Sequence, residues 1–256
     1  MNGFNANAMD ACPYPGIRDY LQKQTYPDDF LTRAKVVSVW CEDRDRSSSI
    51  AAFANIPHVA ENLDALISQV DGVLLARDDA ENHFRFAMPV IERGLPIYVD
   101  KPLGYSVAAA SKLLDAAQEG YIFSCSALRY DTDLQLTAEE KMNVGELKKI
   151  HAVVMKSWAK YAIHLLEPLF AGELKDRPVR GHGMIQTDRI LNVFYRTDDG
   201  LELQVSEYPD TRCGIALTYI GNKGAVTKRH VNSFLAFRTA LERFIEMMEM
   251  KRPPLT

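Results

Sequence analysis

Asp100, Lys101 and Pro102 place an acid and a lysine directly after a short apolar run that ends at Val99. Such a run is typical of a buried strand, and the ligands of open α/β sheets bind at the carboxyl ends of the strands. A lysine at this position can therefore meet a substrate or a cofactor. The alternative interpretation is a strand-to-loop turn that carries a solvated lysine.

The sequence around this lysine alternates between short apolar runs and amphipathic segments. We expect strands at 36–40, 72–76, 97–99 and 121–125, and helices at 47–54, 62–70, 79–93 and 106–119. Asn62 suits the N-cap of the second helix, and Gly94 suits the end of the third. Strands that are apolar throughout and are connected by helices predict a parallel sheet with helices on both faces.

The pattern changes after about residue 145. An extended run at 147–157 and a short helix at 161–171 precede apolar runs at 184–186, 190–195, 201–207, 214–220 and 225–230. Two glycine-containing turns, at 198–200 and 221–224, indicate hairpins. The sequence therefore predicts an α/β part and then an α+β part with an antiparallel sheet, followed by a final helix at 234–250.

Composition limits the classes of function. The net charge of −4 gives no electrostatic reason to expect nucleic acid or an anionic membrane as partner. No apolar run approaches the ~20 residues that span a bilayer, and the first residues lack the basic and apolar regions of a secretory signal. The four cysteines lie far apart without a C-x-x-C pair, so we expect reduced thiols, a cytoplasmic protein and no metal site.

Several short motifs follow one another in order along the chain. They are Val70-Asp71-Gly72-Val73, His83, the segment from Gly94 to Asp100-Lys101-Pro102, Arg129-Tyr130, and Lys160-Tyr161-Ala162-Ile163-His164. Each motif alone is weak, but their order and spacing are fairly specific. They resemble the glucose–fructose oxidoreductase/inositol dehydrogenase family, often called Gfo/Idh/MocA, and the resemblance covers nearly the whole chain.

The resemblance implies two domains and a small polar, sugar-like substrate. Residues 1–128 would form a Rossmann-like dinucleotide-binding domain that is incomplete at its N-terminus. Residues 129–256 would form an α+β domain that binds substrate and assembles a homo-oligomer through its antiparallel sheet. The stripe of Leu201, Leu203 and Val205 must then cover a core, a helix or another subunit.

The resemblance also implies a nicotinamide-dependent redox site between the two domains. Lys101 would bind the reacting oxygen, His164 would donate or accept a proton, and Tyr161 would contact the substrate. Hydride transfer to a carbonyl leaves an oxyanion, which needs a cation and a proton source, and an imidazole suits the second task. Without the resemblance, His164 is best interpreted as a helix histidine held by core contacts.

The expected cofactor is NAD or NADP, with NAD slightly favoured. By spacing, Cys41 occupies the position of the acid that binds the adenosine ribose in the family. Glu42 or Asp43 could bind the ribose hydroxyls instead, which favours NAD, whereas Arg44 and Arg46 could accept a 2′-phosphate. The alternative interpretation is a solvated cluster of charges.

Further residues complete the expected cofactor and substrate sites. Arg77 could reach a phosphate or a substrate acid, or pair with the neighbouring Asp78 or Asp79; His83 could line the cofactor pocket or pack the start of a helix. Asp100 and Pro102 complete the cofactor set. Arg129 and Lys160 are the expected substrate-binding residues, and one helical turn separates Lys160 from His164, so that both can face one cleft.

The sequence departs from the family pattern at its N-terminal end, and this departure suggests a second possible function. The family begins with a strand and a glycine-rich G-x-G-x-x-G turn that approaches the cofactor pyrophosphate. The first 35 residues here contain only Gly3 and Gly16 and no convincing buried strand. The chain is therefore expected to start after the first strand, as a shortened version of a longer gene product or as a natural variant. The alternative function is a catalytically inactive relative that serves as a binding or assembly module.

Overall fold

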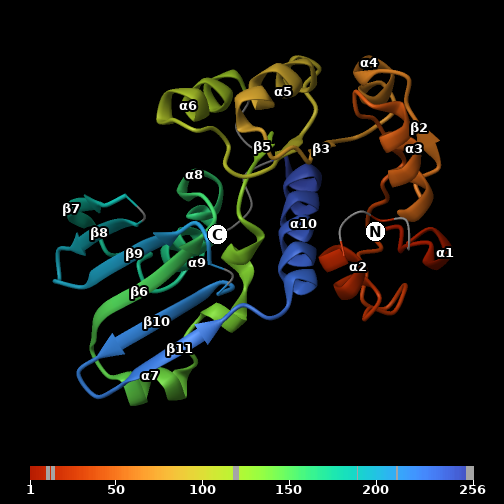
Figure 1. Ribbon diagram of the computed structural model, residues 1–256. Helices are drawn as coiled ribbons and strands as arrows, with labels where there is room; N and C mark the ends of the chain where they lie inside the picture. Colours follow the sequence, from red (N-terminus) through yellow and green to blue (C-terminus); the bar gives the residue numbers. More distant parts are fainter. Residues whose placement is uncertain (10–11, 13–14, 118–120, 189, 212, 252–256) are drawn as a thin grey trace. The chain divides into compact units, whose positions relative to one another are not determined.

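A computed structural model describes residues 1–9, 12, 15–117, 121–188, 190–211 and 213–251 (Figure 1). The chain divides into two compact units. The first comprises Met1–Ser124 together with the final segment from Arg238 onward, and the second comprises Cys125–Phe237. The final helix therefore begins in the second unit and continues in the first.

The first unit opens with short elements around a two-stranded sheet. Strand β1 pairs in parallel with β2, and Asp43 and Asn62 cap the helices α3 and α4 with their side chains, as the sequence predicted for Asn62. The elements are α1 (Ala6–Met9), α2 (Pro15–Leu21), β1 (Ser38–Val39), α3 (Arg44–Phe53), β2 (His58–Val59) and α4 (Leu63–Ile67). Strand β2 was missed because its two residues, His58 and Val59, are too few to show an alternating or continuous apolar pattern.

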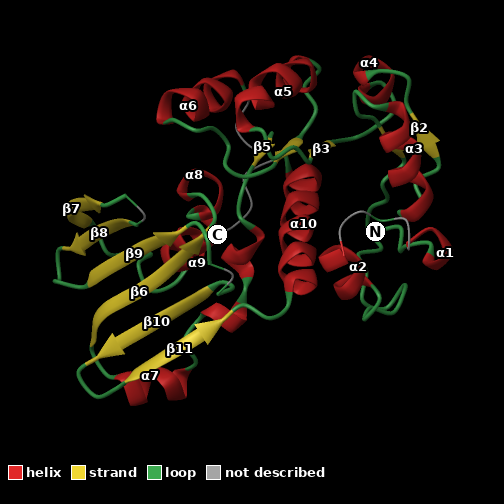
Figure 2. Cartoon of the chain, in the orientation of Figure 1, coloured by secondary structure: helices red, strands yellow, loops and turns green. Residues whose placement is uncertain are grey.

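A second parallel sheet of the first unit has the order β3-β4-β5. Its helices lie beside it in Figure 2, and the buried core includes Val90, Ile97, Val99 and Leu113. The elements are β3 (Val73–Leu75), the 3-10 turn η1 (Ala80–Asn82), α5 (His83–Glu92), β4 (Ile97–Val99), α6 (Val107–Ala116) and β5 (Ile122–Phe123). The last two positions of the expected helix 106–119 lie outside the described residues.

The final helix α10 (Ser233–Met250) supplies an aromatic side chain to this core. The Phe244 ring lies 5.7 Å from that of Tyr98 and 6.1 Å from that of Phe123. Both distances are within the range of favourable aromatic pairs. The segment of α10 in the first unit is therefore packed against β4 and β5.

The second unit contains a six-stranded sheet of order β11-β10-β6-β9-β8-β7. Its strands are β6 (Leu147–Met155), β7 (Val179–Gln186), β8 (Leu191–Thr197), β9 (Glu202–Tyr208), β10 (Ala216–Gly221) and β11 (Ala225–Arg229). The expectation of an antiparallel sheet needs one correction: β6 and β9 pair in parallel, so the sheet is mixed and mostly antiparallel. A parallel pair needs a long crossover, and residues 156–201 between these strands provide it.

One face of this sheet is buried. Leu201, Leu203 and Val205 are buried, together with Ile150 and Ala152 of β6. The predicted apolar stripe is therefore covered in the single chain. The helical elements of this unit are η2 (Ala127–Tyr130), η3 (Thr132–Leu134), α7 (Ala138–Val144), α8 (Trp158–Tyr161) and α9 (Ile163–Ala171).

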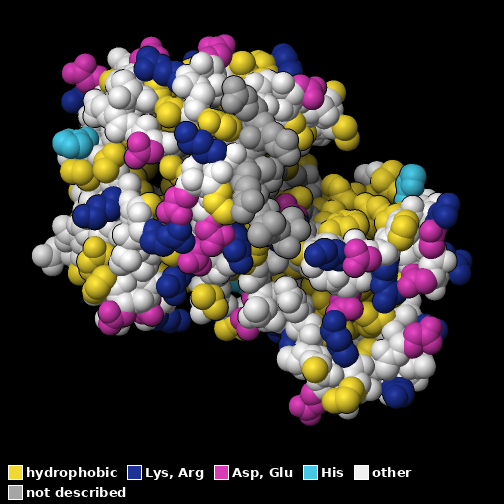
Figure 3. All heavy atoms as spheres, turned by 180° about the vertical axis from the view of Figure 1, so that it is seen from behind, with side chains coloured by type: hydrophobic (Ala, Val, Ile, Leu, Met, Phe, Trp, Pro, Cys, Tyr) yellow, Lys and Arg dark blue, Asp and Glu magenta, His cyan; other side chains and the backbone are white. Residues whose placement is uncertain are grey.

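The described part of the chain includes no helix with the length and apolar character that a membrane crossing requires. On the face shown in Figure 3, basic and acidic side chains are interspersed rather than gathered by sign. Such mixing creates no large field of one sign.

Candidate active site

Lys101 follows the carboxyl end of β4, where the backbone N–H of Asp100 donates to the carbonyl of Leu75 in β3 at 3.0 Å. The Lys101 Nζ lies 4.0 Å from Asp100 Oδ2, and the lysine side chain is 19% exposed. Burial raises the pKa of the Asp100 carboxyl, while the Lys101 charge opposes this effect. Pro102 follows through a cis peptide bond. The lysine expected from the sequence is therefore held, half-buried, at a strand end.

Arg77 follows β3 and is held by carboxylates. Its Nε and Nη2 donate to the two oxygens of Asp79 at 2.8 and 2.7 Å, and its Nη1 lies 3.3 Å from Glu42 Oε2. The guanidinium also lies 4.3 Å from the ring centroid of Phe86. The bidentate pair holds the pKa of the Asp79 carboxyl well below its usual range. Of the alternatives weighed from the sequence, the structure contains the pair with Asp79.

The two acids that follow β1 have different surroundings. Asp43 accepts from the backbone N–H groups of Asp45 and Arg46 at 2.9 and 3.1 Å, so its carboxylate caps α3. The carboxylate of Glu42 is half exposed and lies near the guanidinium groups of Arg77 and Arg85. Glu42 is therefore the acid at this strand end whose carboxylate is not used by a helix terminus.

His83 begins α5 and is fully buried. Its Nε2 lies 2.8 Å from the carbonyl oxygen of Arg77, and its Nδ1 lies 3.3 Å from that of Leu103. A neutral imidazole donates one hydrogen bond, and the shorter distance favours Nε2 as the donor. The ring connects the segments that follow β3 and β4, which agrees with the interpretation that His83 packs the start of a helix.

His164 lies in α9 of the second unit, and its Nδ1 is 2.8 Å from the hydroxyl of Ser126. The same hydroxyl oxygen accepts the backbone N–H of Leu128 at 3.2 Å, so its own proton can be donated to the histidine. A ring that accepts at Nδ1 carries its proton on Nε2. The arrangement therefore fixes the ring and favours the tautomer with the proton on Nε2.

Glu167 is three residues after His164 on the same helix, and it also reaches Ser126. Its carboxylate accepts the Ser126 backbone N–H, and Arg129 Nη1 lies 3.6 Å from its Oε2. Burial raises the pKa of the Glu167 carboxyl, and these two contacts oppose the effect. The segment after β5 is thus connected to α9 in two ways. Ser126 contacts His164 and Glu167, and Arg129 lies near Glu167.

Tyr161 and Lys160 lie on α8, which is separated from α9 by Ala162. The Tyr161 hydroxyl accepts from Lys156 Nζ at 2.9 Å, and its ring centroid lies 5.7 Å from that of His164. Ala162 has φ −58° and ψ −33°, and its N–H donates to the carbonyl of Trp158, so the backbone stays helical between the two segments. The expectation that Lys160 and His164 face one cleft stays a prediction.

Sequence reasoning missed Ser126 and Glu167. The spacing of three residues between His164 and Glu167 is a helical signal that could have identified the glutamate. Ser126 lies 38 residues before His164, and no local pattern connects them.

The carboxyl group of Glu167 predicts a pH-dependent stability. Its pKa in the folded chain is raised, so its contribution to stability is present below the usual glutamate value and is lost as the pH rises through the folded value. We expect Glu167→Gln to gain free energy of unfolding, relative to the unaltered chain, between about pH 4 and pH 7. Urea unfolding across this range measures the difference, with the exposed Glu139→Gln as control. The raised pKa of Glu167 is contradicted if the difference in free energy of unfolding between the variant and the unaltered chain is constant or falls as the pH rises.

A family model described as an oxidoreductase family with an NAD-binding Rossmann fold, Gfo/Idh/MocA, matches residues 18–122. The matched segment contains β1 to β4 and Lys101. Over these residues the chain is therefore similar to this family of NAD-binding oxidoreductases, which agrees with the resemblance noted in the sequence. No curated protein sequence is significantly similar to the chain.

Solved structures share the fold over most of the chain. A myo-inositol dehydrogenase from Lactobacillus casei, in complex with NAD(H) and myo-inositol, is 16% identical, with a TM-score of 0.68 over 88% of this chain and 81% of that one. A myo-inositol 2-dehydrogenase from Lactobacillus plantarum is 11% identical, with a TM-score of 0.68 over 90% and 86%. A UDP-N-acetylglucosamine 3-dehydrogenase from Acidithiobacillus ferrooxidans is 14% identical, with a TM-score of 0.67 over 89% and 85%. At these identities the likeness shows the fold.

Proposed function

We propose that this protein is an NAD(P)-dependent oxidoreductase that transfers hydride to or from a small polar, sugar-like substrate. The observation that carries the proposal is Lys101, held half-buried at the carboxyl end of β4 within the segment that matches the family. Such strand ends are where open α/β sheets bind their ligands. Two relatives of the same fold are inositol dehydrogenases by name, which supports a polyol or sugar.

We assign a separate role in the reaction to each of the candidate residues. The nicotinamide, when bound, supplies or accepts the hydride. The Lys101 ammonium group binds the reacting oxygen and stabilises the negative charge that develops there. His164 exchanges the proton at Nε2, because Ser126 holds Nδ1. Tyr161 contacts the substrate, and Arg129 and Lys160 provide positive charge for its polar groups.

The strand ends of the first unit suit part of a nicotinamide dinucleotide. Glu42 has a half-exposed carboxylate after β1 and would accept from ribose hydroxyls, which favours NAD over NADP. The remaining contacts with the cofactor at these strand ends would come from five further residues: Asp43, Arg77, His83, Asp100 and Pro102.

Titration calorimetry with NAD(H) and NADP(H) tests the proposal. We expect dissociation constants below the millimolar range, with tighter binding of NAD(H), and we expect Glu42→Ala to remove most of the difference between the two. Glu61→Ala, on the exposed loop before α4, is the matched control. Millimolar or weaker binding of both nucleotides would contradict the proposal and would favour the alternative of a non-catalytic binding or assembly module.

We also propose that the six-stranded sheet carries a homo-oligomer contact. The face opposite the buried stripe presents a hydrogen-bonded polar group formed by His151, Asn192, Gln204 and Ser206. Light scattering is expected to give a multiple of the 28.8 kDa chain mass. Asn192→Arg, which places a charge in the middle of this face, is expected to shift the mass toward one chain. A single-chain mass for the unaltered protein contradicts this proposal.

A further inference from the structure

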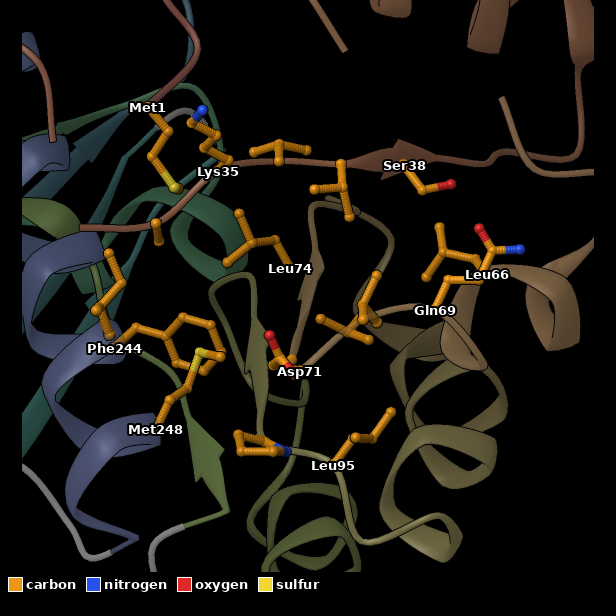
Figure 4. A pocket seen from close by; sticks show the side chains of 18 of the residues that line it. Met1, Lys35, Ser38, Leu66, Gln69, Asp71, Leu74, Leu95, Phe244 and Met248 are labelled. Atoms are coloured by element: carbon orange, nitrogen blue, oxygen red, sulfur yellow. The ribbon is translucent and has the colours of Figure 1, made fainter. Parts of the chain in front are cut away.

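A cavity of about 840 Å³ in the first unit is bordered by apolar side chains such as Leu74, Phe244 and Met248 (Figure 4). The described residues that line this cavity include no histidine or cysteine. The cavity therefore lacks the usual base for nucleophilic chemistry. Such a base lies in the second unit, in a group of three side chains that the proposed hydride transfer does not use.

Asp131, His230 and Ser233 form a hydrogen-bonded chain within the second unit. His230 Nδ1 lies 2.5 Å from Asp131 Oδ2, and His230 Nε2 lies 2.8 Å from Ser233 Oγ. The acid lies between η2 and η3, the histidine directly follows β11, and the serine begins α10. An acid, an imidazole and a hydroxyl connected in this order are the arrangement by which serine hydrolases activate their nucleophile.

The carboxylate of Asp131 is buried and held in one orientation. The residue is 4% exposed, and its Oδ1 accepts the backbone N–H of Asp133 at 2.9 Å, while its Oδ2 faces the imidazole. Because a buried carboxylate needs hydrogen-bond donors, the His230 ring places its proton on Nδ1. The neutral ring then has its lone pair on Nε2.

The hydroxyl of Ser233 faces this lone pair and donates its proton to it. The backbone of the histidine is fixed as well, because the N–H of His230 donates to the carbonyl of Ile215 at 3.0 Å. Ser233 itself is half-buried, and the His230 side chain is 14% exposed. The hydroxyl therefore has a base in place and is not closed off from solvent.

The first turn of α10 adds a donor beside this hydroxyl. The first N–H groups of a helix have no partner within the helix. The N–H of Leu235 donates to Asn232 Oδ1 at 3.1 Å, whereas the N–H of Ser233 lies next to its own hydroxyl. The Ser233 N–H is therefore placed to donate to an oxyanion that forms at this serine.

Apolar side chains near Ser233 are exposed. Phe237 lies one helical turn after Ser233 on the same face of α10 and is 49% exposed, and Val231 precedes the helix and is also exposed. These side chains offer an apolar surface to a short acyl group.

We propose that Ser233, His230 and Asp131 form a second catalytic site, which hydrolyses small carboxylic esters. Ser233 Oγ bonds to the ester carbonyl carbon while its proton passes to His230 Nε2. The carbon–oxygen bond to the alcohol then breaks, and the alcohol takes that proton. Water attacks the acyl-serine and gives a proton to His230, which returns it to Ser233 Oγ as the acid leaves. Asp131 positions the ring, and an alcohol, which leaves more readily than an amine, suits a site with a modest oxyanion donor.

Labelling with an alkyl fluorophosphonate tests this proposal on the full chain without nucleotide. An activated serine forms an Oγ–P bond with this reagent as the P–F bond breaks and fluoride leaves, and peptide mass spectrometry locates the adduct. The matched control is Ser48, an exposed serine of α3 whose hydroxyl donates to the carbonyl of Arg44 at 2.9 Å. We expect Ser233 to react about 10²-fold faster than Ser48 or more. No adduct at Ser233 with millimolar reagent, or equal rates at the two serines, overturns the proposal.

Variants of the base and of the control serine add a second readout. We expect His230→Gln to lower the labelling rate of Ser233 and the hydrolysis of 4-nitrophenyl acetate by ~10²-fold or more, and Ser48→Ala to change neither. Circular dichroism checks that each variant is folded. Labelling of Ser233 at an unchanged rate in folded His230→Gln also overturns the proposal. Labelling of the unaltered chain decides the question even if this variant does not fold.

Discussion

Replacing His164 by alanine is expected to lower kcat/KM for the proposed hydride transfer by ~10²–10⁴-fold, the usual contribution of a positioned acid–base group. The substitution removes the proposed proton exchange at Nε2, while the strand ends of the first unit, where we propose that the nucleotide binds, are untouched. We therefore expect nucleotide affinity to stay within about twofold of the unaltered value. The measurement is steady-state turnover with a panel of inositols and sugars, followed through the absorbance of the reduced nicotinamide.

Ser126→Ala provides the positioning control for this prediction. The variant keeps the imidazole but removes the hydroxyl at Nδ1, so the ring loses the contact that favours the Nε2–H tautomer. We expect a smaller fall in kcat than for His164→Ala, together with a displaced pH profile. Full activity of His164→Ala would remove this histidine from the reaction.

Replacing Lys101 by alanine is expected to lower kcat by ~10²–10³-fold, as for the loss of one group that stabilises a developing oxyanion. The ammonium group acts most strongly where charge develops, so we expect the loss to fall on kcat more than on KM. The measurement is the same turnover assay with saturating nucleotide. Lys101→Arg keeps the charge but changes its position and geometry, and we expect it to recover only part of the rate.

Lys112→Ala is the matched control for the lysine. Lys112 lies on α6 of the same unit, with its Nζ 4.1 Å from the ring centroid of Phe84, so its loss removes a positive charge at a position with no proposed role in the reaction. We expect its turnover to stay close to that of the unaltered chain. Equal rates for Lys101→Ala and Lys112→Ala would contradict the assignment of the reacting oxygen to Lys101.

The elements that position Lys101 could be predicted because their signals are local. The apolar run at Ile97–Val99 is the observed β4, and the Asn62 cap and the Gly94 stop fall where the helices begin and end. In the second unit, the hairpin turn at Asp198–Gly200 connects β8 to β9 as expected. These features depend on a few neighbouring residues, which one sequence contains in full.

Features that depend on distant residues could not be predicted in the same way. The parallel pairing of β6 with β9 joins residues such as Ile150 and Leu203, and a sheet order of this kind leaves no local pattern. The hydrogen bond between Ser126 and His164 and the ion pair between Arg77 and Asp79 depend on side-chain positions in the folded chain. The structure therefore adds the partners of each candidate residue rather than the candidates themselves.

We propose that this chain moves hydride between a nicotinamide and a sugar-like carbon with the help of Lys101 and His164. Isotope transfer tests this proposal. The chain is incubated with NADH deuterated at C4 and a panel of keto-inositols and keto-sugars, and the deuterium content of the products is measured by mass spectrometry. Transfer of deuterium to a product carbon, abolished in Lys101→Ala and His164→Ala, is the predicted result. No transferred deuterium to any member of the panel, or equal transfer by both variants, would contradict the account.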